Sequence, residues 1–171
     1  MKLFAHTFTT PLGPFSAAVD ASGALVATAF GDLAALRQRL LACHVVRDDA
    51  TLPSDPWRTQ PVGEQLDAYF SGALRRFTLP LAPMGSEFQH RVWTALQAIP
   101  FGTTRSYGDL ARALGSAPRA VGRANATNPL CLVVPCHRVL GADGSLTGFA
   151  FGAELKRRLL VHEGARAATA A

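Results

Sequence analysis

The chain has 171 residues, of which 49% are hydrophobic and 17% are charged, and its net charge at pH 7 is +5. A chain of this size can bury a core as one large domain or two small ones, so its composition predicts an ordinary soluble globular protein. Its apolar stretches are interrupted well before the roughly 18 residues that a membrane span needs, and the N-terminus lacks a signal-peptide pattern. These features exclude a membrane protein and favour the cytoplasm.

The first thirty residues have the pattern of three short strands. Runs rich in β-branched, aromatic and small apolar residues lie at 3–8, 15–19 and 24–30. Turn-forming residues separate them, at 11–14 and at 20–23. Short strands that alternate with such turns predict two antiparallel hairpin connections.

Helices are expected to follow these strands. Asp32 can cap a helix that runs to about Cys43, and the residues 57–70 fit a second helix. The segment 71–83 is a further strand candidate, and 83–86 is the predicted linker to the second half of the chain.

From Ser86 onward the pattern becomes helical. A capping residue opens an amphipathic helix that ends before Pro100. Two short helices are then predicted at 107–114 and at about 117–126, separated by a Gly-Ser break. Such a pair is a candidate helix-turn-helix, although helical hairpins in ordinary protein cores look similar.

The last third of the chain leads into and out of a Pro-Cys-His-Arg run at residues 135–138. The apolar segment 130–134 is predicted to be a buried β segment that delivers the chain to this run. A Gly-rich loop at 141–152 and a helix from about 153 to 162 follow it. The tail, residues 166–171, is expected to be disordered.

This order of elements predicts an α+β protein with two domains. Residues 1–82 would form an N-terminal α/β structural domain, and 86–165 a mostly helical C-terminal domain. Residues 1–85 hold seven Lys and Arg against seven Asp and Glu, whereas residues 86–171 hold ten against five. A basic second half is compatible with a polyanionic partner, although many basic proteins never bind nucleic acid.

The chain has three cysteines, Cys43, Cys131 and Cys136, and an odd number in a chain of this size favours reduced thiols over a disulfide framework. No C-x-x-C pair and no H-E-x-x-H run is present, so we expect no metal site. A nucleophilic thiol needs a base or a positive charge beside it, and Cys136 has both in His137 and Arg138. A buried structural cysteine is the alternative interpretation, and it is the one that we favour for Cys43 and Cys131.

The stretch 128–139, in which Asn-Pro precedes an apolar run and then Pro-Cys-His-Arg, resembles the signature of the O6-alkylguanine-DNA alkyltransferases. These are also called methylated-DNA–protein-cysteine methyltransferases. The resemblance continues upstream to Phe88 and downstream through Gly148-Phe149 to the run 159–164, and so covers the whole second half. The first half resembles the family's ribonuclease-H-like N-terminal domain only in size and in its order of strands and helices.

The resemblance implies direct-reversal DNA repair in a single turnover. Cys136 would accept the alkyl group of O6-alkylguanine, mainly O6-methylguanine, and would keep it irreversibly. His137 would act as the general base through a water, and Glu163 would orient the imidazole. Tyr107 would supply a proton or hydrogen bond to the departing base, and Asn128 would hold the active-site loop. No cofactor is needed, because the sulfur itself performs the displacement.

The same resemblance implies contacts with double-stranded DNA through the minor groove. The target base must be flipped out of the stack, and Arg119 would take its place. Small residues, among them Ala120 and Gly122, would let the second helix of the pair approach closely. Arg123 is a candidate phosphate contact, with a solvated charge as its alternative. We expect the protein to act as a monomer.

A guanine pocket is implied around the backbone of Val139, Phe149 and Ala150, with Arg138 counted among its residues. Three features depart from the family pattern. Ala150 stands where relatives often carry a hydroxyl, Asn125 stands where a larger apolar residue is often found, and the spacing from Tyr107 to Arg119 is two residues shorter than in many relatives. The range of alkyl groups, any activity on O4-alkylthymine and any link to transcription stay open.

Other classes of protein are alternatives to this interpretation. A non-catalytic lesion-binding protein of the alkyltransferase-like kind would share the fold, but it would lack the reactive Cys136. A helix-turn-helix regulator would not explain why His137 and Glu163 also match the family, and a cysteine hydrolase would not explain Arg119.

Overall fold

The computed structural model describes residues 1–46 and 51–166. Contacts between Cα atoms divide the chain into two compact units. The first holds Met1–Met84 together with Pro129–Val133, and the second holds Gly85–Asn128 and the chain from Val134 onward. The segment Pro129–Val133 thus clusters with the first unit, and the role predicted for each domain stays a prediction.

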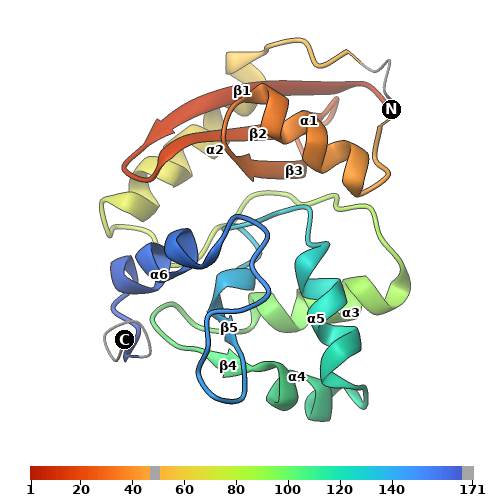
Figure 1. Ribbon diagram of the computed structural model, residues 1–171. Helices are drawn as coiled ribbons and strands as arrows, with labels where there is room; N and C mark the ends of the chain where they lie inside the picture. The colour runs from red at the N-terminus through yellow and green to blue at the C-terminus, as the bar shows by residue number, and fades with distance from the viewer. Residues whose placement is uncertain (47–50, 167–171) are drawn as a thin grey trace. The chain divides into compact units, whose positions relative to one another are not determined.

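The first unit is built on a three-stranded antiparallel sheet of order β1-β2-β3 (Figure 1). The strands are β1 (Leu3–Thr10), β2 (Gly13–Asp20) and β3 (Leu25–Phe30). Leu3 lies opposite Asp20, and Phe15 lies opposite Phe30. Both predicted hairpin connections are therefore confirmed.

Two helices pack on this sheet, α1 (Leu33–Ala42) in front of it and α2 (Pro56–Phe70) behind it in Figure 1. Asp32 caps α1 as predicted, because its carboxylate accepts a hydrogen bond of 3.0 Å from the backbone N–H of Ala35. Residues 15–19 and 25–29 are all buried, so β2 and β3 are covered on both faces. The core of this unit lies there.

The prediction of a strand at residues 71–83 is wrong. This segment forms only an isolated parallel bridge between Leu81 and Leu25. The N–H of Leu25 donates to the carbonyl of Pro80, and the N–H of Ala82 donates to the carbonyl of Leu25, at 2.8 Å each. Pro80 and Pro83 have no N–H group to continue such a ladder, so the pairing ends after one residue.

The second unit opens with α3 (Glu87–Gln97), for which Ser86 and Gln89 form a reciprocal capping box. Two short helices follow, α4 (Tyr107–Leu114) and α5 (Pro118–Ala126), and they pack against each other as the predicted helix-turn-helix pair (Figure 1). Gly115 ends α4 in the left-handed conformation, with φ of 62°.

The prediction of a strand at residues 130–134 is also wrong. Its five residues are buried, but the chain turns at Leu132, which adopts a left-handed φ of 72°, and Leu130 makes only an isolated bridge to Thr28. The chain then forms a short 3-10 helix, Cys136–Arg138, and β5 (Val139–Leu140). A continuous apolar run indicates burial, and here burial does not mean a strand.

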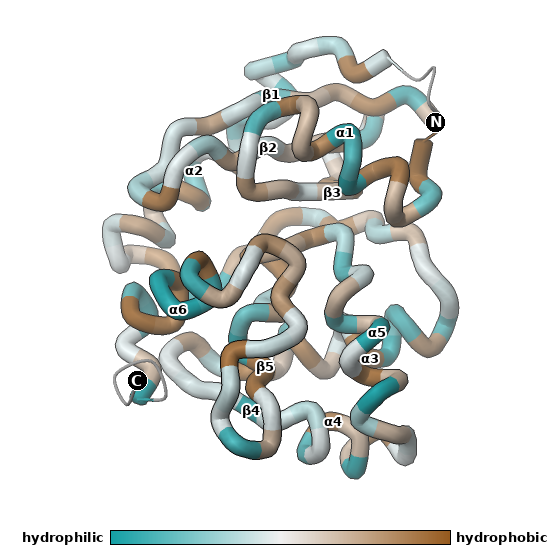
Figure 2. Tube along the Cα trace, viewed as in Figure 1, coloured by the Kyte–Doolittle hydropathy of each residue, from teal (hydrophilic) through white to brown (hydrophobic). Residues whose placement is uncertain are grey.

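Strand β5 pairs in parallel with β4 (Arg105–Ser106), and the chain ends in α6 (Ala153–His162). Hydrophilic and hydrophobic stretches alternate along α6 in Figure 2, because one face of the helix is buried. The predicted disordered tail lies outside the described residues, apart from Arg166. None of the helices within 1–46 and 51–166 has the length and hydropathy of a membrane span.

The contribution of the Ser86 cap to the stability of α3 can be tested. Replacing Ser86 with Ala removes the side-chain oxygen that accepts from the N–H of Gln89. We expect the free energy of unfolding to fall by about 1 kcal/mol, measured by urea denaturation. Ser116→Ala, in the turn between α4 and α5, is the matched control and should leave stability within about 0.5 kcal/mol of the parent.

Candidate active site

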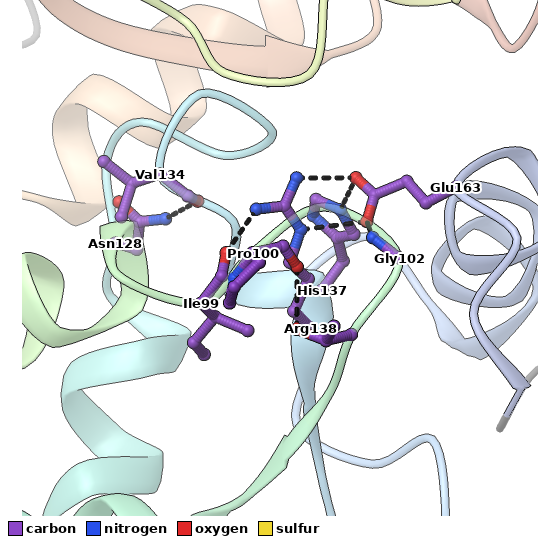
Figure 3. Close-up of polar contacts among 9 residues, drawn as sticks. Ile99, Pro100, Gly102, Asn128, Val134, His137, Arg138 and Glu163 are labelled. Carbon is purple, nitrogen blue, oxygen red and sulfur yellow. Dashed lines mark hydrogen bonds and ion pairs between the residues drawn. The ribbon is translucent and has the colours of Figure 1, made fainter.

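Cys136 begins the 3-10 turn that follows Pro135, and it is only 4% exposed. Its N–H donates to the carbonyl of Val134 at 2.7 Å. The side-chain amide of Asn128 donates to the same carbonyl at 2.9 Å, from a fully buried position (Figure 3). Asn128 is therefore bonded to the turn that carries Cys136.

His137 and Glu163 meet in the interior of the second unit (Figure 3). The Nε2 atom of His137 lies 2.8 Å from Oε1 of Glu163, and both side chains are inaccessible to solvent. The other ring nitrogen, Nδ1, is buried and has no hydrogen-bond partner among the described residues. The imidazole is thus anchored at one nitrogen and open at the other, which is the arrangement that a general base requires.

Arg138 bonds to Glu163, and its predicted place in the guanine pocket stays a prediction. Its Nε and one terminal nitrogen donate to the two carboxylate oxygens of Glu163, at 2.8 Å and 2.9 Å. The other terminal nitrogen donates to the carbonyl of Ile99 at 2.6 Å. A guanidinium that is only 6% exposed needs such partners, so Arg138 serves as the counter-ion of Glu163.

Burial and hydrogen bonding set the protonation states of this group. Complete burial lowers the pKa of His137, and this outweighs the raising effect of the Glu163 carboxylate. Burial by itself would raise the pKa of Glu163, but the bonds and charges of His137 and Arg138 overcome it and hold that pKa well below its usual range. Near pH 7 the group therefore consists of a neutral imidazole and an ion pair.

Tyr107, the first residue of α4, places its hydroxyl near the Cys136 turn. The hydroxyl donates to the carbonyl of Thr147 at 3.1 Å. Burial, and secondly the charge of Cys136, raise the pKa of Tyr107 to about 12, so the phenol keeps its proton. A Cβ atom at Gly148 would stand 2.3 Å from the hydroxyl oxygen, and φ there is +78°. Only glycine fits beside Tyr107 at this position.

A cavity of about 560 Å³ opens beside Tyr107. The helix-turn-helix pair and the loop after β5 line it with the residues Tyr107, Gly108, Pro118, Arg119, Gly122, Arg123, Ala126, Ala142, Thr147 and Gly148. Three of the four predicted DNA contacts are therefore together at its wall. The fourth, Ala120, lines a smaller cavity of about 260 Å³ between α3 and α5.

The residues predicted for the guanine pocket are not among those that line the larger cavity. Val139 is fully buried, and its carbonyl accepts from Nζ of Lys156 at 2.5 Å. The ring of Phe149 packs edge-on against that of Phe151, and Ala150 is exposed. Their backbone roles stay predictions.

Lys156 is a residue that the sequence analysis missed. It is fully buried, and its Nζ also donates to the carbonyl of Thr147 at 2.9 Å. Burial lowers the pKa of Lys156 to about 8. A signal was present in the sequence, because Lys156, Leu159, Leu160 and Glu163 follow the i, i+3, i+4, i+7 spacing of one helix face. Lys156 and Glu163 are the charged residues on this otherwise apolar face. A charged side chain on a buried face needs a partner for its charge or hydrogen bonds in the interior.

These features define a class of protein: one in which a buried cysteine directly precedes a buried His137–Glu163 pair in the chain, and a helix-turn-helix pair carries an exposed Arg119. Residues 87–165 match the family model described as the DNA binding domain of 6-O-methylguanine DNA methyltransferase. The chain is also 50% identical over 115 residues to a methylated-DNA–protein-cysteine methyltransferase of Mycobacterium bovis, 70% of whose length is covered, and it belongs to this family.

Named relatives support this assignment. The chain is 55% identical over 102 residues to a methylated-DNA–protein-cysteine methyltransferase of Methanosarcina acetivorans and 57% identical over 102 residues to one of Mycolicibacterium paratuberculosis. Each match covers 58% of this chain but only 65% and 62% of the relatives' own length. The crystal structure of Mycobacterium tuberculosis OGT in complex with DNA is 37% identical, with a TM-score of 0.81, and 97% of each chain is covered. The predicted family and the predicted α+β fold are confirmed.

The buried imidazole makes stability depend on pH. The unfolded chain takes up a proton at His137 near pH 6.5, whereas the folded chain resists it because its pKa is lowered. Stability should therefore fall by up to about 1.4 kcal/mol between pH 7.5 and pH 5.5 on account of this residue. Urea denaturation at the two pH values measures the loss. His137→Gln should remove it, and His90→Gln, at an exposed position, should not.

Proposed function

We propose that this protein repairs O6-alkylguanine, mainly O6-methylguanine, by moving the alkyl group onto Cys136, once per molecule. The observation that carries the proposal is the buried turn in which Cys136 precedes a neutral His137 held by Glu163. The protein acts as a methylated-DNA–[protein]-cysteine S-methyltransferase, a monomer in the cytoplasm. The relatives' names and the DNA complex of the mycobacterial protein support this reading.

The chemistry is one displacement at carbon. The sulfur of Cys136 forms a bond to the alkyl carbon as the bond from that carbon to O6 of guanine breaks. The thiol proton passes through a water to Nδ1 of His137, the nitrogen with no protein partner in the described chain. Tyr107 gives its proton to the guanine anion and regains one, through water, from the proton that His137 took up, so the net products are a thioether and neutral guanine.

Access to the base requires that it leave the duplex, which costs a few kcal/mol. Arg119 is exposed near the start of α5, beside the cavity, and would fill the space that the base leaves. Ala120 and Gly122 let α5 approach the minor groove, and Arg123 would contact a phosphate. This surface belongs to the second unit, and we assign residues 1–82 a structural role.

The guanine itself would be read by backbone groups. Phe149 and Ala150 follow directly on Gly148 at the wall of the cavity, and their amides and carbonyls can meet the base edge. The carbonyl of Val139 already accepts from Lys156, but an oxygen with two lone pairs can accept a second donor.

Transfer to Cys136 has a direct test. The protein is incubated with duplex DNA that contains one O6-methylguanine, and its intact mass is measured. We expect the mass to rise by one CH₂ unit, mapped to Cys136 by peptide analysis. Cys136→Ser should show no adduct, and Cys43→Ser, the matched control, should react like the parent. Lesion binding without any mass change would favour a non-catalytic lesion sensor.

The role of Arg119 separates base flipping from chemistry. Arg119→Ala should slow methyl transfer from duplex DNA by at least tenfold, because nothing then occupies the gap in the stack. It should leave the reaction with the free base O6-benzylguanine within twofold of the parent. Arg157→Ala, which removes a half-exposed arginine of α6 that pairs with Glu154, is the control for lost charge. Equal losses on both substrates would contradict the flipping role.

A further inference from the structure

Asn125 joins two parts of the site that come from different segments of the chain. It lies on α5, on the side opposite to solvent, and is only 2% exposed. Its Nδ2 donates to the hydroxyl oxygen of Tyr107 at 3.3 Å and to the carbonyl of Cys136 at 3.4 Å. One amide group thus connects the proton donor at the start of α4 with the turn of the nucleophile.

The chemistry of these partners determines how the amide is oriented. The carbonyl of Cys136 can only accept a hydrogen bond, so Nδ2 and not Oδ1 of Asn125 must face it. The same nitrogen then donates to the oxygen of Tyr107, whose own hydrogen must point elsewhere. It points to the carbonyl of Thr147. Asn125 therefore selects the direction in which Tyr107 donates.

The oxygen of the Asn125 amide lowers the stability of the folded state. Oδ1 of Asn125 is buried and has no hydrogen-bond partner within residues 1–46 and 51–166. An apolar side chain of similar volume would avoid this unsatisfied acceptor, so packing alone does not favour an asparagine here. A polar group kept at such a cost beside the nucleophile points to a role in the reaction.

We propose that Asn125 is a positioning residue, which holds the hydroxyl of Tyr107 as a donor directed toward the reacting base and ties it to the Cys136 turn. The inference rests on the proposed function. When guanine enters, the O–H of Tyr107 exchanges the Thr147 carbonyl for the base, while Nδ2 of Asn125 stays on the oxygen and stabilises the negative charge that develops there.

Lys156 makes this exchange possible. The Thr147 carbonyl that Tyr107 releases still accepts from Nζ of Lys156 at 2.9 Å. The carbonyl of Thr147 therefore keeps a protein partner when the hydroxyl turns away. The hydroxyl of Tyr107 has two alternative acceptors, and only the presence of the base decides between them.

The first test is the rate of a single turnover. Asn125→Leu should slow methyl transfer to Cys136 by about tenfold, the factor that corresponds to one lost hydrogen bond to a developing charge. The Kd for lesion-containing DNA should stay within twofold, because Asn125 is buried. Gln97→Leu removes an exposed amide from α3 and is the matched control. An unchanged rate in Asn125→Leu would overturn the inference.

A double-mutant cycle separates positioning from general damage. If Asn125 acts through Tyr107, the Tyr107→Phe/Asn125→Leu variant should react no more than twofold slower than Tyr107→Phe alone. Losses that multiply would place the effect of Asn125 elsewhere and contradict the role. Failure of the unmodified protein to take up the methyl group would instead reject the proposed function, and it is read in the same mass measurement.

A spectroscopic readout does not depend on the reaction. The chain has only two tyrosines, Tyr69 and Tyr107, so fluorotyrosine labelling gives two ¹⁹F signals, assigned with Tyr107→Phe. Because the Asn125 bond opposes the burial that raises the pKa of Tyr107, Asn125→Leu should move the titration of this residue to higher pH and leave Tyr69 unchanged. A signal of Tyr107 that titrates as in the parent would show that the bond has no effect on the phenol.

Discussion

The buried carboxylate of Glu163 is the constraint on which the site depends. A carboxylate in the interior is tolerated only when its charge and lone pairs are satisfied. Here His137 and Arg138 bond it from the active-site turn, and the N–H of Gly102 lies 3.4 Å from Oε2. The end of α6, the loop after α3 and the 3-10 helix are therefore held together at one point. Loss of Arg138 would leave the buried carboxylate without its counter-ion.

This arrangement also explains how the imidazole of His137 stays neutral beside a carboxylate. Arg138 already balances the charge of Glu163 through two parallel bonds, so His137 is not required to be cationic. The carboxylate orients the imidazole at Nε2, and Nδ1 is left as the atom that takes the thiol proton in the proposed reaction. In that reaction Arg138 would contribute indirectly, through the electrostatics of Glu163.

The departures from the family pattern have a local explanation in the second unit. The turn between α4 and α5 is short because Gly115 ends one helix in a left-handed conformation and Pro118 begins the next. Arg119 remains exposed at the cavity in spite of the reduced spacing from Tyr107. Asn125 bonds both Tyr107 and Cys136. Of the three departures expected from the sequence, one therefore concerns the length of this turn and another a polar contact in the site.

The sequence by itself determined the elements whose signals are local. The bounds predicted for α4 and α6, and the cap of α1 by Asp32, agree with the structure because caps and helical spacing act within a few residues. The strands expected at 71–83 and 130–134 are absent, since an apolar run reports burial and not conformation. Only the tertiary structure decided that Arg138 pairs with Glu163 and that Lys156 is buried. These charges are satisfied by partners far along the chain, and no local pattern specifies which distant group a buried charge will meet.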